Sequence, residues 1–289
     1  MNVLSLFDGM SCGRIALERA NIKVDKYFAS EVDKYAMQIS NKNYPDIIQV
    51  GDVQNVHYPE TFDGHKIDLL IGGSPCQGFS FARKGLNFDD PRSKLFFEYA
   101  RLVKECKPKY FLLENVRMKQ ECQNVISEML GVKPIKINSS LLSAQNRQRL
   151  YWTNIPVSKI TDKGLVLKDI LQNDHNMPDR PSVFYATKKP SLCKQVAEAD
   201  DIRGMRSIKA IYSAEAKSPT LTTMTGGHRE PKVATGENTY RKLTPLECER
   251  LQTVPDNYTD GVSKTQRYKM LGNGWTVDVI AHIFKGIEV

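Results

Sequence analysis

A short apolar run that ends in two glycines and a Pro-Cys pair constrains the fold more than any other stretch. Ile67-Asp-Leu-Leu-Ile71 is followed by Gly72-Gly73-Ser74 and then by Pro75-Cys76. Apolar residues in a short block closed by glycines predict a strand that is buried on both faces and continues into a tight loop. A cysteine at the carboxyl end of such a strand lies where open α/β sheets bind ligands. A free cysteine is more often a small buried residue, so a functional role for Cys76 depends on motifs elsewhere in the chain.

Strands and helices alternate along the first half of the chain. Besides the run at 67–71, the predicted strands cover Val3–Phe7, Lys26–Ser30, Ile47–Val50 and Lys109–Val116, and the predicted helices cover Arg14–Ala20, Leu95–Val103 and Gln120–Leu130. This order predicts an α/β fold with a doubly wound, mostly parallel sheet.

Glycines and acids follow the first three strands. Asp8-Gly-Met-Ser-Cys-Gly13 is a turn that leads into a helix, whose first N–H groups are free to meet a ligand. Glu31, at the end of the second strand, is well placed for ribose hydroxyls, whereas Asp33 is typical of a helix cap. Asp52, after the third strand, can accept from an adenine amino group or merely form a turn.

Two more groups of polar residues follow the later strands. Glu114 ends a buried strand, so it is expected at the same sheet edge as Cys76. Gln145, Arg147 and Arg149 lie at alternate positions, which in an extended chain places them on one face. Inward-pointing arginines need anionic or carbonyl partners. The alternative is a basic strand on the surface.

The composition changes between about residues 155 and 242. Regular helical periodicity fades, and hydroxyl and glycine residues accumulate in Ser218–His228. We expect a smaller irregular domain here, whose loops contact a polyanion through backbone and hydroxyl groups. Regular structure returns at Thr244, a predicted N-cap, with Pro245 at the first helical position and Glu247 three residues after the cap.

The bulk properties exclude some classes of protein. The net charge of +8 suits a polyanionic partner. No apolar run approaches the roughly 18 residues of a membrane span, and the first residues have no secretory pattern. The six cysteines form no Cys-x-x-Cys pair, so we expect reduced thiols in a cytoplasmic protein and no metal site.

Taken together, the motifs resemble those of the DNA cytosine-5 methyltransferase family. Pro75-Cys76-Gln77, Glu114-Asn115-Val116 and Gln145-x-Arg147-x-Arg149 occur in the order of the family's motifs, between Phe7-Asp-Gly9 and Gly272-Asn-Gly274. Ser11-Cys12 and Trp275 differ from most bacterial members and are similar to phage-encoded and eukaryotic de novo enzymes.

The resemblance implies a Rossmann-like fold that uses S-adenosylmethionine and releases S-adenosylhomocysteine. The catalytic domain would cover residues 1–154 and 243–289, and a target-recognition domain residues 155–242. The catalytic residues would be Cys76, Glu114, Arg147 and Arg149. The cofactor-binding residues would be Phe7, Asp8, Gly9, Ser11, Gly13, Glu31, Val32, Asp52, Val53, Pro75, Leu95, Asn273 and Trp275. The DNA-binding residues would be Gln77, Ser80, Arg83, Lys84, Gln145, Thr220, Leu221 and Arg229.

The resemblance also implies a mechanism. Cys76 would add to carbon 6 of a cytosine flipped out of duplex DNA, a protonated Glu114 would contact ring nitrogen 3, and Arg149 would hold the carbonyl oxygen at position 2. Arg147 would order the surroundings of Glu114 and Cys76 or bind a phosphate. An RNA cytosine methyltransferase is one alternative, although the Cys-Phe-Thr signature of the tRNA-methylating branch is missing. A catalytically silent DNA-binding module is another. The recognition sequence, an accompanying restriction enzyme, the choice between monomer and homodimer, and a bacterial or phage origin stay open.

Overall fold

The computed structural model describes residues 1–74, 91–174, 176–184 and 191–288. Within it the chain forms two compact units. The first, called the sheet unit below, comprises Met1–Ile137, Gln148–Lys159 and Val279–Val289. The second, called the barrel unit, comprises Asn138–Arg147 and Ile160–Asp278.

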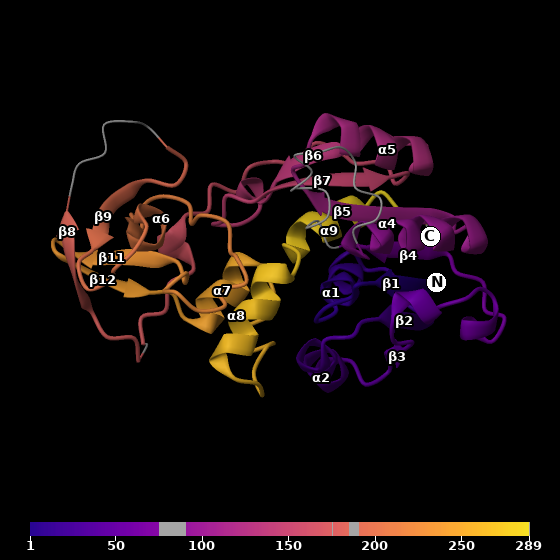
Figure 1. Ribbon diagram of the computed structural model, residues 1–289, viewed down its shortest axis with the longest axis horizontal. Coiled ribbons are helices and arrows are strands. Elements are labelled where there is room, and N and C mark those ends of the chain that lie inside the picture. The colour runs from indigo at the N-terminus through magenta and orange to yellow at the C-terminus, as the bar shows by residue number, and fades with distance from the viewer. Residues whose placement is uncertain (75–90, 175, 185–190, 289) are drawn as a thin grey trace. The chain divides into compact units, whose positions relative to one another are not determined.

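A seven-stranded sheet forms the centre of the sheet unit (Figure 1). Its strands, in chain order, are β1 (Asn2–Leu6), β2 (Lys26–Ser30), β3 (Ile48–Gln49), β4 (Leu69–Gly72), β5 (Tyr110–Val116), β6 (Ile135–Asn138) and β7 (Gln148–Thr153). They lie in the order β3-β2-β1-β4-β5-β7-β6. Pairing is parallel from β3 through to β5, and β7 is antiparallel to β5. The predicted mostly parallel, doubly wound sheet is therefore confirmed.

The helices of this unit are α1 (Cys12–Arg19), α2 (Lys34–Asn43), α4 (Pro91–Cys106), α5 (Gln120–Leu130) and most of α9 (Val277–Phe284). The bounds of α5 agree with the prediction, α1 begins two residues before its predicted range, and α4 extends beyond its predicted range at both ends. Asp33 caps α2 as predicted, because its carboxylate accepts from the N–H groups of Tyr35 and Ala36.

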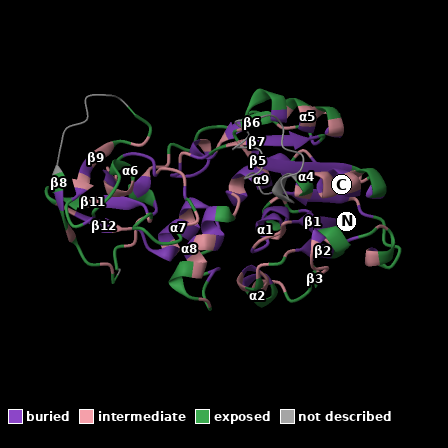
Figure 2. Ribbon diagram, viewed as in Figure 1, coloured by how far each residue is buried: buried purple, intermediate pink, exposed green. Residues whose placement is uncertain are grey.

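Alternate strand residues build one large apolar cluster. Leu4, Leu6 and Leu70 from the sheet pack in it with Phe96 of α4 and Ile126 of α5. The strand residues between them point to the opposite face and are buried too. Figure 2 shows the strands as buried and the outer helix surfaces as exposed. Burial on both faces explains why these strands are apolar runs.

The order of the strands determines where a ligand can bind. The chain leaves β1 toward β2 on one side, and β4 is followed by β5 on the other. The switch point therefore lies between the carboxyl ends of β1 and β4, where open α/β sheets bind their ligands. Gly73 and Ser74, which follow β4, lie at this edge.

The barrel unit contains a closed barrel of five strands in the order β10-β11-β12-β8-β9. The strands are β8 (Arg180–Phe184), β9 (Gln195–Ala199), β10 (Ala210–Tyr212), β11 (Lys232–Gly236) and β12 (Thr239–Lys242). The helices of the unit are α6 (Arg206–Lys209), α7 (Pro245–Leu251) and α8 (Lys264–Asn273). This region is more regular than its composition predicts, since short strands around a small core leave little periodicity in the sequence.

The compact units differ from the predicted domains at three stretches. Residues 138–147 and 243–278 belong to the barrel unit, although we expected them with the sheet, and residues 155–159 belong to the sheet unit, although we expected them in the smaller domain. Side-chain bonds explain why 243–278 groups with the barrel. The Arg241 guanidinium forms a two-pronged ion pair with Glu247 of α7, and the Tyr268 hydroxyl of α8 donates to the Leu243 carbonyl at 2.7 Å. The start of α7 agrees with the prediction, with Thr244 and Glu247 forming a capping box.

No helix among the described residues is long and apolar enough to cross a bilayer.

Candidate active site

The loop after β1 is fixed to the end of β2 by a carboxylate. The Gly9 N–H donates to Glu31 Oε2 at 2.7 Å, and Glu31 Oε1 accepts from the N–H groups of Val32 and Asp33 at 2.7 and 2.8 Å. Phe7, Gly9 and Ser11 all have left-handed backbone angles, with φ of 57°, 61° and 63°. Such conformations are costly for Phe and Ser and persist only where neighbouring contacts enforce them.

Asp8 supplies those contacts. Its carboxylate accepts from the Tyr27 hydroxyl at 2.7 Å and from the Ser11 hydroxyl at 2.5 Å, and Ser11 Oγ lies 2.6 Å from Ser40 Oγ. Burial raises the pKa of Asp8 to about 6, and the charge of Glu31 adds to the rise, against the hydrogen bonds, which lower it. Sequence reasoning missed Tyr27, whose only signal is a hydroxyl at an otherwise apolar strand position.

The other predicted cofactor-binding residues of the sheet unit differ in their exposure. Asp52 caps the short helix η1 (Val53–Asn55) by accepting from the Gln54 N–H. Val53 is buried in the apolar cluster, and Leu95 packs against the same cluster. Val32 is 71% exposed, so its side chain is free to cover a flat ligand. Gly13 lies inside α1 and is buried.

Glu114 and Arg149 form an ion pair. Arg149 Nε lies 2.9 Å from Glu114 Oε1, and both side chains are largely buried. The pair forms because β5 and β7 are antiparallel neighbours with Val116 opposite Arg149. Arg149 thus has the anionic partner that its inward direction requires.

Asn115 links this strand to Ser74, the last described residue after β4. Its amide donates to the Ser74 carbonyl at 3.2 Å and to the Ser74 hydroxyl at 3.3 Å. Ser74 is two residues before Cys76. The predictions for Pro75, Cys76, Gln77, Ser80, Arg83 and Lys84 concern residues outside the described part of the chain.

The other cysteines of known environment are poor nucleophiles. Burial raises the pKa of Cys106 to about 12 and also raises the pKa values of Cys122, Cys193 and Cys248. A thiol with a raised pKa carries little thiolate near neutral pH. In the described part of the chain no group of His, Cys, Asp or Glu is arranged to hold a metal ion.

Arg147 binds backbone carbonyl groups rather than a carboxylate. Its buried guanidinium donates to the carbonyl oxygens of Leu221 at 3.1 Å, Gly272 at 3.2 Å and Gly274 at 3.0 Å. The sequence predicted carbonyl or anionic partners for this residue, and carbonyl groups are what it contacts. These three bonds hold a side chain that is 3% exposed.

Gln145 and Leu221, both predicted as DNA contacts, are buried in the structure. Gln145 has no exposed surface; its amide oxygen accepts from the Leu221 N–H at 2.9 Å, and its amide nitrogen donates to the Leu251 carbonyl at 3.2 Å. Leu221 is 1% exposed. Both side chains are thus enclosed within the barrel unit.

The remaining predicted residues also lie in the barrel unit. Thr220 is partly exposed and donates through its hydroxyl to the Asn146 carbonyl at 2.6 Å, and Arg229 is exposed. Asn273 is the last residue of α8 and is exposed, and Trp275 is partly buried.

A family model described as C-5 cytosine-specific DNA methylase matches residues 1–189 and 154–289, which together span the chain. The chain belongs to this family. It is therefore a DNA (cytosine-5-)-methyltransferase, as the motifs predicted, and it is called the methylase below.

Curated relatives agree along the length of the methylase. The type II methyltransferase M1.ScrFI of Lactococcus lactis subsp. cremoris is 29% identical over 96% of this chain and 75% of its own length. The type II methyltransferase M.HhaI of Haemophilus parahaemolyticus is 28% identical over 98% and 93%. The orphan methyltransferase M.SPBetaI of Bacillus phage SPbeta is 26% identical over 99% and 97%.

Solved structures share the fold. The methyltransferase EhMeth of Entamoeba histolytica superposes with a TM-score of 0.78 at 21% identity, over 99% of this chain and 97% of its own. The Dnmt2 methyltransferase of S. pombe gives a TM-score of 0.70 at 16% identity, over 98% and 97%.

Proposed function

We propose that the methylase transfers a methyl group from S-adenosylmethionine to carbon 5 of a cytosine flipped out of duplex DNA, at a short specific sequence, through a covalent adduct between Cys76 and carbon 6. The observation that carries this proposal is the buried pair of Glu114 and Arg149. Glu114 lies on β5, next to β4, the strand that precedes Cys76 in the chain, and Arg149 lies on β7, the neighbour of β5 on its other side. Nitrogen 3 and the oxygen on carbon 2 are adjacent on one edge of cytosine. A carboxyl and a guanidinium side by side match that edge.

The chemistry assigns a role to each group. The Cys76 thiolate adds to carbon 6, and the electron pair of the ring double bond moves so that charge develops toward nitrogen 3. Glu114 delivers a proton or a strong hydrogen bond there, and Arg149 holds the oxygen on carbon 2. Carbon 5 is then nucleophilic enough to take the methyl group, the donor would leave as S-adenosylhomocysteine, and nitrogen 3 returns its proton to Glu114. A base, which can be a water molecule, takes the proton from carbon 5, its electron pair re-forms the bond between carbons 5 and 6, and the Cys76 thiolate leaves.

The bonds of Asn115 support a positioning role in this step. By donating to both oxygens of Ser74, Asn115 fixes the start of the Cys76 loop to the strand that carries Glu114. Cys76 and Glu114 would then be held in a fixed position relative to each other when they contact the base.

The donor residues at the strand ends fit S-adenosylmethionine. When bound, this cofactor supplies an electrophilic methyl group on a sulfonium centre. Glu31 Oε2, which accepts one N–H, has a lone pair left for a ribose hydroxyl, Asp52 is available to the adenine amino group, and the exposed Val32 offers apolar surface to the ring. The left-handed turn at Gly9 leaves open space at its Cα, so a ligand can approach the backbone.

Duplex DNA requires extrusion of the target base, since its carbon 5 is stacked within the helix. Unstacking costs a few kcal/mol, which contacts to the flipped base and to the orphan guanine offset. Sequence readout falls to the exposed residues that follow Thr220, with Arg229 as a candidate for guanine. The bacterial and phage relatives support a bacterial or phage-encoded enzyme that acts in the cytoplasm.

Base-resolution mapping of methylcytosine tests the proposal. Plasmid DNA from cells that express the wild type should carry methylcytosine in one short consensus, and Cys76→Ala should remove it. Glu114→Gln should lower the rate by about 10²–10⁴, the usual contribution of a general acid. Cys122→Ala, on α5, is the matched control and should keep the pattern.

The outcomes separate the alternatives. Methylation that survives Cys76→Ala would contradict the covalent mechanism. Absence of methylation in the wild type would redirect the test to tRNA, and absence there as well would favour a silent DNA-binding module.

A further inference from the structure

The segment Lys217–Leu221 is held on one side by the chain that precedes β7. Its backbone pairs with that chain as a parallel bridge between Gln145 and Ser218, in which the Ser218 N–H donates to the Ala144 carbonyl at 2.7 Å and the Asn146 N–H to the Ser218 carbonyl at 2.9 Å. The exposed residues proposed to read DNA follow this segment directly.

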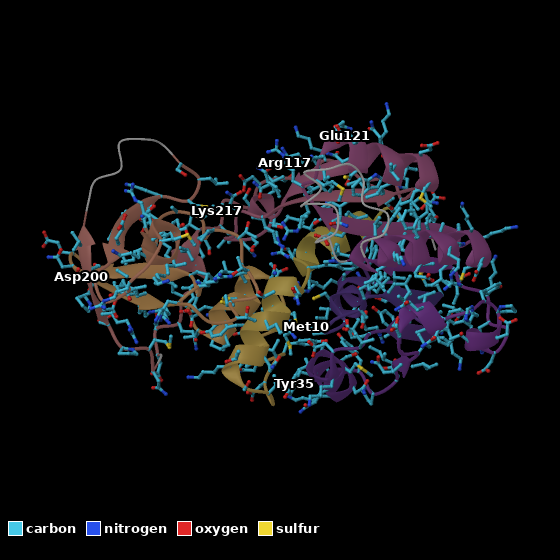
Figure 3. All side chains as sticks on the ribbon, in the orientation of Figure 1. Met10, Tyr35, Arg117, Glu121, Asp200 and Lys217 are labelled. Atoms are coloured by element: carbon cyan, nitrogen blue, oxygen red, sulfur yellow. The ribbon has the colours of Figure 1, made fainter. Side chains whose placement is uncertain are left out.

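Three side chains reinforce the bridge. Gln145 accepts from the Leu221 N–H, and Arg147 donates to the Leu221 carbonyl. Lys217, labelled in Figure 3, sends its buried ammonium to the carbonyl oxygens of Ser140 at 2.6 Å and Ser143 at 3.1 Å. Buried polar groups cost free energy unless they are bonded, so each contact resists displacement of the segment.

Thr222, the residue after this segment, packs closely against α8. The Gly272 Cα lies so close to Thr222 that a Cβ there would be 2.0 Å from the Thr222 carbonyl oxygen. Only glycine permits this approach. Arg147 also donates to the Gly272 carbonyl, so one guanidinium bonds both to Leu221 and to the glycine that contacts Thr222.

The chain passes from the barrel unit into the sheet unit between Arg147 and Gln148. Arg149, the partner of Glu114, is therefore two residues beyond the guanidinium that holds Leu221. One short stretch joins the recognition segment to the catalytic pair.

We propose that Gln145, Arg147 and Lys217 are positioning residues that make methyl transfer depend on the DNA sequence: they fix Lys217–Leu221 to the chain that enters β7, so that correct seating of the reading residues sets the position of Arg149. This proposal rests on the proposed function. It assigns Gln145 and Arg147 to the coupling of recognition with chemistry, in place of contacts to DNA or to the base.

Lys217→Met tests the proposal, because methionine keeps the length of the side chain and removes the two bonds to Ser140 and Ser143. The measurement is kcat/KM on a consensus duplex divided by kcat/KM on a duplex with one changed base outside the target cytosine. We expect this ratio to fall at least tenfold, with the dissociation constant for S-adenosylhomocysteine changed less than threefold. Gln145→Met should act in the same direction. Lys264→Met, an exposed lysine of the same unit, is the control and should leave the ratio unchanged.

A proportional loss of activity on both duplexes would overturn the proposal, since it would show a purely structural role. So would loss of the cooperative thermal transition in both variants. Failure of the proposed function is distinct: the wild type would then methylate neither duplex.

Discussion

The sheet unit and the barrel unit are stabilised in different ways. In the sheet unit, residues from five strands and two helices form one apolar cluster around Leu70 and Phe96. In the barrel unit, the apolar cluster of the strands has five buried members: Ala197, Ala199, Ile202, Ile211 and Tyr240. Two of these five are alanines, which bury little apolar surface.

Buried polar side chains add to the apolar packing of the barrel unit, which also includes Leu251 and Leu271 of its helices. The Arg241–Glu247 pair is almost completely buried, and Glu249, with no exposed surface, accepts from the Asn257 and Thr259 N–H groups. In this unit, bonds between side chains and backbone help to order the short strands and loops. Such bonds are directional, which suits a unit that must present loops in fixed positions.

Breaking the buried ion pair should have the largest effect on stability. Arg241→Ala leaves the Glu247 carboxylate buried without its counter-charge, and we expect a loss of about 3–5 kcal/mol in the free energy of unfolding. Urea denaturation measures this loss. Hydrogen exchange should place the loosened amides around β12 and α7.

The double variant Arg241→Met, Glu247→Leu is the control for this prediction. It removes both charges, so it should cost less than Arg241→Ala alone. It will not restore full stability, because Glu247 also accepts from the Gln172 and Thr244 N–H groups. A cost below about 1 kcal/mol for Arg241→Ala would contradict the importance of polar bonds in this unit.

A matched pair of truncations should sharpen the comparison of the two cores. Leu70 and Ile211 have no exposed surface. Leu70→Ala should destabilise the sheet unit by about 3 kcal/mol or more, since its packed surroundings cannot close the cavity. Ile211→Ala should cost about 2 kcal/mol, because a small cluster relaxes more easily. Equal costs, measured by urea denaturation with hydrogen exchange in each unit, would remove the proposed difference.

The pH dependence of Asp8 should give a smaller effect in the sheet unit. Its pKa is about 6 in the folded protein and 3.8 ordinarily, so folding favours the protonated form. The stabilisation from proton binding is complete below about pH 4 and is lost as the pH rises through 6. Asp8→Asn should therefore raise the melting temperature, relative to wild type, more at pH 7.5 than at pH 5. Exposed Asp46→Asn should show no such difference.

Lys232 in the barrel unit gives a pH dependence of stability with the opposite sign. Burial lowers the pKa of Lys232 from 10.5 to about 8, while its ammonium donates to the carbonyl oxygens of His228 and Glu230. Folding here favours the neutral amine, so stability is lost as the pH falls through 8. Lys232→Met should thus destabilise the protein more at pH 9.5 than at pH 7, by thermal denaturation. The same slope in Asp8→Asn and Lys232→Met would contradict the assigned burial of one of them.

The local sequence is enough to predict the elements and caps that depend on neighbours along the chain. The apolar run at 69–72 had to form a buried strand, Asp33 and Thr244 had to cap helices, and α5 begins and ends where its periodicity does. The order of the motifs determined the family. Each of these signals lies within a few residues, so local physics is enough to read it.

Which polar groups form hydrogen bonds and ion pairs depends instead on the tertiary structure. Arg147 and the Gly274 carbonyl are 127 residues apart in the chain, and Gln145 and the Leu221 N–H are 76 apart. Alternation placed Gln145, Arg147 and Arg149 on one face, yet β7 begins only at Gln148, so the first two bond within the barrel unit and the third pairs with Glu114. The barrel was missed because its strands are short and pair between distant parts of the chain. The bond from Tyr27 to Asp8 was missed because a side-chain contact between separate segments leaves no period in the sequence.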